Sequence, residues 1–262
     1  MDLKDRLLGK DIKIHAYGVN SGTSLLNLND FAVNQVLPAF MGAGFKLDIT
    51  SSDNTKDVAA GTGAKKVKVY GLGVGYVPLV EEIALNGQTA VTTVNTFLRV
   101  FAVAVSLVGT DGVQAGDIYI IKTGSSTWAA GVPNTLTAAS VICKILIAQG
   151  VGYTGYWTVP ADKTDVNGTA QNVRKAKLMS ITPSGGIQNA RLLIQAQPNL
   201  DTDNAMATVW ETVVAGLTAG AAGWIELIDM QEDFDAGTDI VLKVIPLVAG
   251  GSISAQLHIR YV

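Results

Sequence analysis

The chain has 262 residues, carries a net charge of −3, and contains 16% charged and 48% apolar residues. Its Lys and Arg residues form no cluster, so the composition argues against the basic groove that a nucleic-acid partner requires. No apolar run approaches the roughly 20 residues of a membrane-spanning helix. The mean hydropathy of +0.31 favours a protein that buries surface against copies of itself or a large partner.

The first 20 residues mix charged and apolar side chains and lack the apolar core of a signal peptide, so we expect synthesis in a cytoplasm. We predict that residues 1–20 form an arm that adds to an exposed sheet edge of a neighbouring subunit through backbone hydrogen bonds. IKIHAY alternates as a strand does, so the arm could supply such an added strand. The alternative is an ordinary first strand of the protein's own sandwich. The candidate interface residues of this arm are Leu3, Leu7, Leu8, Ile12, Ile14 and Tyr17.

Strand patterns dominate the rest of the chain, with clusters of Gly, Asn, Asp, Ser and Thr between them. We therefore predict an all-β protein with jelly-roll or β-sandwich packing. Asn86-Gly87 is placed where a type I′ hairpin turn would require it. Residues 135–150 fit a helix or a buried strand, and within them Cys143 is expected to be a buried thiol. The expected strands cover residues 45–50, 65–71, 117–122, 189–197, 223–230, 239–247 and 253–262.

A concentration of glycine and aromatic residues near 150–156 indicates a weak boundary. We expect the arm at 1–20, a first β-sandwich half at 21–152 and a second at 153–262. One long sandwich with a crossover is the alternative arrangement.

The run YGLGVGYVP places Gly71, Gly73 and Gly75 directly after an expected strand. A dinucleotide-binding loop needs G-x-G-x-x-G followed at once by a helix. Here the third glycine comes one residue early, and Pro78 with its β-branched neighbours indicates a second strand. The loop is therefore predicted to be a turn between two strands.

No other motif predicts catalysis. Ser52-Asp53-Asn54 and Lys122-Thr123-Gly124 match two signatures of the β-lactamase class, but no Ser has a Lys three residues later to complete the set. His15 and His258 lack a second ligand at metal-binding spacing, and the acidic residues 229–239 lack the pattern of a calcium loop. We expect no enzyme activity, no cofactor and no metal.

Several segments resemble, in order and spacing, a family of tailed-bacteriophage virion proteins. They are GKDIKIHAYGVNSGTS, LDITSSDNTKDVAAGTGAKKVKVYGL, EEIALNGQTAVTTVNTFLRVFAVAV, AGDIYI, GYTGYWTVPADKT and FDAGTDIVLKV. After VPADKT, where similar sequences continue into an apolar strand, this chain has the polar DVNGTAQNVRK.

The resemblance implies a structural component of the virion, of the decoration, cement or head-fibre type. On this basis we expect a capsid decoration protein on the outer surface of the head that binds the major capsid protein. Self-association as a homotrimer is expected from the apolar composition. The alternative is a receptor- or glycan-binding head fibre, neck or tail module.

Overall fold

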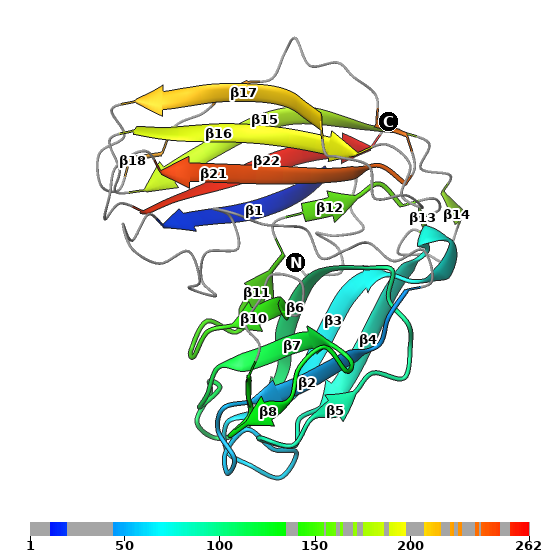
Figure 1. Ribbon diagram of the computed structural model, residues 1–262, viewed down its shortest axis with the longest axis vertical. Coiled ribbons are helices and arrows are strands. Elements are labelled where there is room, and N and C mark those ends of the chain that lie inside the picture. Colours follow the sequence, from blue (N-terminus) through cyan, green and yellow to red (C-terminus); the bar gives the residue numbers. More distant parts are fainter. Residues whose placement is uncertain are drawn as a thin grey trace. The chain divides into compact units, whose positions relative to one another are not determined.

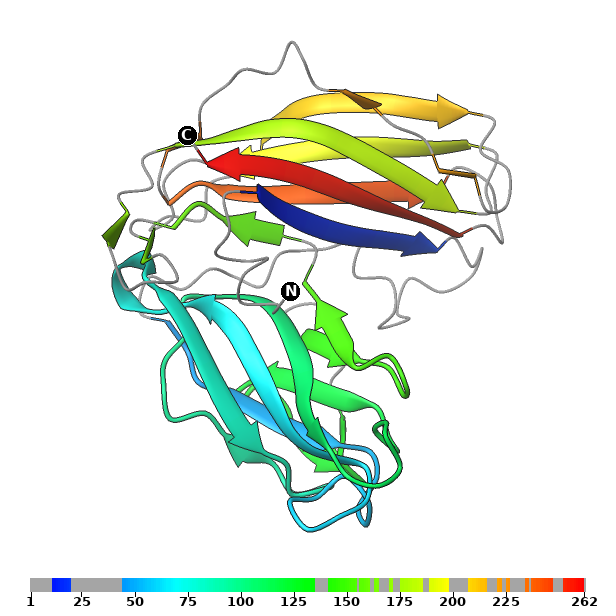
Figure 2. The same cartoon turned by 180° about the vertical axis from the view of Figure 1, so that it is seen from behind.

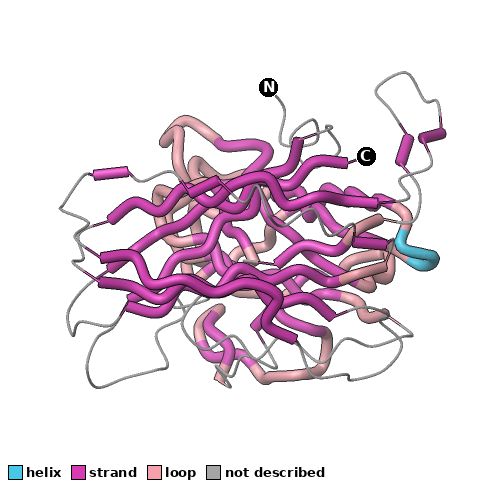
Figure 3. The backbone as a smooth tube through the Cα atoms, turned by 90° about the horizontal axis from the view of Figure 1, so that it is seen from above, coloured by secondary structure: helices cyan, strands magenta, loops and turns pink. Residues whose placement is uncertain are grey.

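The computed structural model divides into two compact units, the first comprising Met1–Gln35 with Gly155–Val262 and the second Val36–Thr154. The structure describes residues 11–19, 44–134, 141–154, 156–160, 163–164, 170–171, 175–185, 189–197, 207–215, 221–222, 225–226, 234–235, 237–246 and 252–261. Strands make up nearly all regular structure in these ranges, and the one helical element is a single 3-10 turn (Figure 3). The all-β fold class is confirmed. None of the described helical residues forms a segment long and apolar enough to cross a membrane.

The first unit consists of two antiparallel sheets stacked as layers (Figures 1 and 2). One sheet has the order β1-β22-β15-β18, with β19 and β20 also paired to β15, and the other has the order β12-β21-β16-β17. The first sheet contains β1 (Asp11–Val19), β22 (Ser252–Tyr261), β15 (Lys175–Gly185), β18 (Ala221–Ala222), β19 (Ile225–Glu226) and β20 (Phe234–Asp235). The second contains β12 (Tyr156–Thr158), β21 (Asp239–Pro246), β16 (Asn189–Gln197) and β17 (Ala207–Ala215), and a separate ladder joins β13 (Lys163–Thr164) to β14 (Ala170–Gln171).

This strand order is that of a jelly roll. Four antiparallel pairs are nested along the chain: β1 with β22, β12 with β21, β15 with the short strands β18 to β20, and β16 with β17. Folding such a nested set over itself brings the pairs into two facing sheets. The second unit lies in the chain between β1 and β12, the first and second strands of this jelly roll.

The edge strand β1 pairs within its own chain, in register from Asp11 opposite Arg260 to Val19 opposite Ser252. The expectation that residues 1–20 are an arm separate from the sandwich is therefore wrong for Asp11–Val19, and the alternative, an ordinary first strand, applies. Residues 1–10 and 20 lie outside the described residues. The physical reason is that β22 alternates buried and more exposed positions and needs a neighbour on this side to satisfy its backbone groups.

The second unit also consists of two four-stranded antiparallel sheets, β10-β7-β2-β5 and β11-β6-β3-β4 (Figures 1 and 2). The first contains β10 (Val141–Ile145), β7 (Ile118–Lys122), β2 (Leu47–Ser51) and β5 (Val91–Thr92). The second contains β11 (Val151–Tyr153), β6 (Arg99–Val108), β3 (Ala64–Leu72) and β4 (Pro78–Ala84), and a short hairpin joins β8 (Trp128–Ala129) to β9 (Val132–Pro133). The 3-10 turn η1 (Val74–Tyr76) connects β3 to β4.

The core of the second unit forms between the facing sheets. Buried residues of β2 and β7, such as Leu47 and Ile120, pack with residues of β3 and β6, such as Val69 and Val103. Cys143 of β10 belongs to this cluster and is fully buried, as expected. Burial raises the pKa of its thiol to about 12.

Two local expectations are settled by the sheet assignments. Residues 141–145, which fit a helix or a strand, form β10, while 135–140 lie outside the described residues. Asn86-Gly87 does not form a type I′ hairpin, because β4 and β5 on either side belong to different sheets. Gly87 alone of the pair has a positive φ, +58°, so the turn redirects the chain from one sheet to the other.

Candidate functional site

Three of the six predicted interface residues fall within the described strand β1, and their role in an interface stays a prediction. Leu3, Leu7 and Leu8 lie outside the described residues. Ile12, Ile14 and Tyr17 occupy β1 at positions opposite Ile259, Leu257 and Ser254 of β22.

The glycine-rich run forms the hairpin loop between β3 and β4, so the prediction of a turn is confirmed. Leu72 pairs with Pro78, and within the loop the Gly73 N–H donates to the Val77 carbonyl at 2.9 Å. Gly75 has φ +75° and Tyr76 has φ +59°. No helix begins here that could bind a phosphate.

The two partial β-lactamase signatures are held apart. Ser51 pairs with Ile118 and Leu47 with Lys122, so the segment starting at Ser52 and the segment starting at Lys122 leave the β2–β7 ladder at opposite ends. Four residues of strand separate them by about 13 Å. They cannot form one catalytic centre.

The two histidines occupy neighbouring strands of the jelly roll. His15 lies opposite Gln256, and His258 lies opposite Lys13 on one side and Ser180 on the other. Across the described ranges, no three His, Cys, Asp or Glu side chains are grouped to hold a metal ion.

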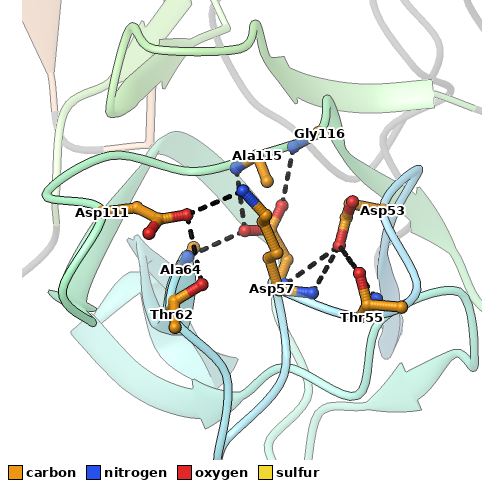
Figure 4. A network of polar contacts seen from close by, with 9 residues as sticks. Asp53, Thr55, Asp57, Thr62, Ala64, Asp111, Ala115 and Gly116 are labelled. Carbon is orange, nitrogen blue, oxygen red and sulfur yellow. Dashed lines mark hydrogen bonds and ion pairs between the residues drawn. The ribbon is translucent and has the colours of Figure 1, made fainter.

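A buried polar centre of the second unit is the carboxylate of Asp57, a residue that is fully inaccessible to solvent. Its Oδ1 accepts hydrogen bonds from the backbone N–H of Ala64 at 2.7 Å and of Ala115 at 2.9 Å. Its Oδ2 accepts from the Gly116 N–H at 2.9 Å (Figure 4). The same oxygen accepts from the Ser51 hydroxyl at 2.6 Å. One side chain thus joins β2, the start of β3 and the loop before β7.

The turn that carries Asp57 is itself built by Asp53. The Asp53 Oδ1 accepts from the N–H of Lys56 at 2.5 Å and of Thr55 at 2.9 Å (Figure 4). These bonds, that from Lys56 foremost, lower the pKa of Asp53 because they favour its charged form. Lys56 pairs with Asp111 at 3.1 Å, which joins this turn to the loop after β6. The network is architectural, since both oxygens of the buried Asp57 carboxylate accept from donors of its own chain.

Four exposed valines lie in the β3–β4 hairpin and in the loop after β5, and we refer to them together as the hairpin patch. Its members are Val74 (76% exposed), Val77 (46%), Val80 (39%) and Val94 (80%).

Buried and half-buried polar groups hold the two segments of the hairpin patch. Glu81 accepts from the N–H groups of Val94 at 2.7 Å and Asn95 at 2.9 Å, and from the Asn95 side chain at 2.9 Å. In the hairpin loop, the Arg99 guanidinium lies 5.9 Å from the Tyr76 ring centroid, and the Arg99 side chain is buried. The exposed valines therefore project from fixed segments.

A second apolar patch lies at the other end of the unit, and we call it the loop patch. It comprises Leu107 (46% exposed) and Val108 (37%) of β6, Val113 (45%) and Ile147 (55%).

The two loops of this patch are joined by hydrogen bonds. The Gln114 side chain donates to the Leu146 carbonyl at 2.6 Å. Asp117 accepts from the Ile147 N–H at 2.9 Å and pairs with Lys144 at 2.8 Å. The apolar side chains again stand on segments that polar contacts fix.

Neither patch was predicted from the sequence, although a signal was present. The hairpin residues VGYVPLV and the loop residues Val113 and Ile147 place aliphatic side chains within turn sequences, where polar residues are usual.

No family model matches the chain, and no curated protein matches it. Similar solved structures include virus particles and a phage spike. The structure of infectious bursal disease virus Gx strain has 12% identity over 84% of this chain and 58% of its own, with a TM-score of 0.19. The Gt strain structure has 13% identity over 96% and 70%, with a TM-score of 0.20. The stem and receptor-binding domain of the spike protein P1 from bacteriophage PM2 has 9% identity over 96% of both chains, with a TM-score of 0.22.

This chain spans 58% and 61% of the first two virus-particle chains it matches. Likeness at this level establishes neither a shared topology nor a function.

Proposed function

We propose that the protein is a structural component of a virion. The observation that carries the proposal is the pair of exposed apolar patches, each held on segments that Glu81 or Asp117 fixes by hydrogen bonds. Apolar side chains on ordered segments of a β-sandwich favour a binding role, because these segments lose little conformational entropy when a partner binds. The sequence resemblance to tailed-phage virion proteins supports the same class of function.

Within this class, we propose a capsid decoration or cement protein that binds the major capsid protein on the outside of the head. The role needs no cofactor and no catalytic residue, because binding depends on the contact area and on the symmetric repetition of the contacts. Many weak contacts repeated over a shell give high total affinity. The charge of −3 and the absence of a basic cluster in the sequence suit a protein partner better than the packaged nucleic acid.

Quantitative mass spectrometry of purified particles tests this function. A decoration protein is expected at hundreds of copies per particle, and antibody labelling is expected on intact heads. Absence of the protein from purified particles would overturn the virion proposal.

A second candidate is a receptor- or glycan-binding fibre, neck or tail module. It is favoured by the jelly-roll order of the first unit, which lectin domains share with viral capsid proteins. A dozen or fewer copies per particle, with binding of the purified protein to host-cell glycans, would favour this candidate over decoration.

A further inference from the structure

Asn86 and Gly87 form a dipeptide that is chemically labile in an unfolded chain. The backbone nitrogen of Gly87 can attack the side-chain carbonyl carbon Cγ of Asn86, because glycine has no Cβ to hinder the approach. The nitrogen gives its hydrogen to the departing amide group, which leaves as ammonia, and a cyclic succinimide forms. Water then opens the ring at one of its two carbonyl carbons and yields aspartate or isoaspartate. In isoaspartate the main chain runs through the side-chain carbons and is one atom longer.

The folded second unit holds the main chain on both sides of this reaction. The Gly87 N–H donates to the Asp57 carbonyl at 2.9 Å, and the Gly87 carbonyl accepts from the Ser51 N–H at 2.8 Å. Asn86 forms an antiparallel bridge with Val58. Gly87 is buried, whereas Asn86 is exposed. The attacking nitrogen is therefore fixed in the interior, although the amide that it would attack is open to solvent.

Cyclisation requires the Gly87 nitrogen to move. The nitrogen must come within bonding distance of the Asn86 Cγ and lose its hydrogen. This movement breaks the hydrogen bond to the carbonyl of Asp57, a fully buried residue. The turn also has little room to rotate, because a Cβ built on Gly87 would lie 3.1 Å from the Cα and the carbonyl oxygen of Asn54. The reaction therefore needs the turn to open.

The isoaspartate product does not fit the closed turn. Ser51 and Asp57, which bind the two sides of Gly87, are joined to each other by the Ser51 hydroxyl and the Asp57 carboxylate at 2.6 Å. An extra main-chain atom at position 86 displaces Gly87 relative to these two partners. The lengthened chain cannot restore both hydrogen bonds at once.

We propose that Asn86 is a latent deamidation site of the second unit. The folded unit keeps Asn86 unreactive, and opening of the unit lets the Gly87 nitrogen attack and form isoaspartate, which prevents the turn from closing again. The network around Asp57 thus determines how long a copy of the chain stays intact, because chemical modification makes local opening irreversible. The inference concerns the second unit alone and goes beyond the proposed role in a virion.

The test measures deamidation of the purified full-length chain at pH 7.4 and 37 °C, in buffer and in guanidinium chloride. Peptide mass spectrometry follows the loss of the Asn86 amide and separates aspartate from isoaspartate. The reaction is expected to be at least about tenfold slower in the folded chain, because it passes only through the open fraction. Asn167-Gly168, the other Asn-Gly pair of the sequence, is the internal control and is expected to react as fast as Asn86 in the denaturant.

Intermediate denaturant concentrations give a second measurement on the unmodified chain. The rate at Asn86 is expected to rise in parallel with the unfolded fraction of the second unit, which alkylation of the buried Cys143 thiol reports. A rate that stays constant while the unfolded fraction rises would contradict a reaction through the open unit.

Asp57→Ala is expected to raise the rate at Asn86 in buffer by at least about tenfold, because the weakened network opens more often. The matched control is Asp111→Ala, which removes an exposed ion pair with Lys56 and is expected to leave the rate nearly unchanged. Asn86→Asp has the charge of the product on a normal backbone. It is expected to refold as the unmodified chain does, whereas the isoaspartate fraction of an aged sample is not.

The proposal is overturned by any of three results. Equal rates at Asn86 in buffer and in denaturant would show that the turn gives no protection. A folded Asp57→Ala variant that deamidates no faster than the unmodified chain would show that the network does not provide the protection. Recovery of the native structure by the isoaspartate fraction would show that the modification does not block closure.

Discussion

Ser51 donates its hydroxyl hydrogen to the carboxylate of Asp57, with Oγ and Oδ2 2.6 Å apart and both residues buried. The contact joins the end of β2 to the turn that precedes β3. Three backbone N–H groups complete the coordination of this carboxylate. One polar side chain thus contacts both the turn before β3 and the loop before β7.

Replacement of Asp57 by alanine is expected to lower the free energy of unfolding of the second unit by about 3 kcal/mol or more, because three buried donors and one partly buried donor lose their acceptor. Urea unfolding followed by circular dichroism measures the loss. The matched control is Asp111→Ala, which removes an exposed ion pair with Lys56 and is expected to cost about 1 kcal/mol or less. Equal losses in the two variants would contradict the central role of Asp57.

Acid is expected to weaken the turn at Asp53. The pKa of Asp53 is lower in the folded chain than its usual value of 3.8, so its charged form contributes stability above that value. The contribution falls as the pH drops below 3.8 and is lost once the pH passes below the folded-state pKa. Asp53→Asn keeps the capping geometry without the charge, so its stability deficit relative to the unmodified chain is expected to shrink in this window. Urea unfolding between pH 2.5 and 7 measures the difference, and a deficit independent of pH would contradict the assignment.

Gly131→Ala is expected to destabilise the second unit more than Gly124→Ala. Both glycines have φ near +75°, where alanine costs about 1 kcal/mol. A Cβ at Gly131 would lie 2.0 Å from the Ser51 carbonyl oxygen, whereas a Cβ at Gly124 would meet nothing within 4 Å. The comparison separates the steric cost from the conformational cost. Equal melting temperatures for the two variants would show that the loop at Gly131 relaxes freely.

The thiol of Cys143 is expected to resist alkylation in the folded protein at pH 8. Its pKa is raised to about 12 by burial, so the reactive thiolate is scarce, and the β10–β7 layer covers the sulfur. Iodoacetamide labelling followed by mass spectrometry is expected to modify Cys143 only after the second unit is unfolded in urea. Rapid labelling under native conditions would contradict its place in the core.

Deletion of residues 1–19 is expected to unfold the first unit, because it removes β1 and leaves the backbone groups along one edge of β22 without their partners. The second unit has its own core and is expected to remain folded. Resistance of Cys143 to alkylation is therefore the internal control for the folding of this unit. A truncated chain that keeps the full cooperative transition of the first unit would show that β1 is dispensable.

Local sequence patterns predicted the strands whose side chains alternate or whose ends carry turn residues. The hairpin at Gly71–Gly75 was predicted because Pro78 and β-branched residues follow the glycines. The longer strands β6, β15 and β17 were not among the expected strands. The first half of β6 is buried on both faces and therefore lacks alternation, and β15 contains Pro183, which is unusual within a sheet.

The candidate surfaces were not predictable in the same way. A valine in a turn sequence is exposed or buried according to what packs against it, and the sequence does not state this. Val77 is exposed, whereas Leu79, two residues further along the chain, is half-buried against the core. Glu81 lies 13 positions from Val94, whose N–H it binds, and Asp117 lies 30 positions from Ile147. Local sequence patterns do not reach over such separations.

By itself, the sequence determined that the chain is all-β and where most of its turns lie, because alternation and turn chemistry act over a few neighbouring residues. Only the tertiary structure decided that β1 is the first strand of a jelly roll whose last strand is β22. Asp11 and Arg260 pair although nearly the whole chain separates them, and the residues of the second unit lie between them in the sequence. The backbone groups that form this pairing are the same in every residue, so the choice of partner depends on which faces are buried together, and that is settled only when the whole core assembles.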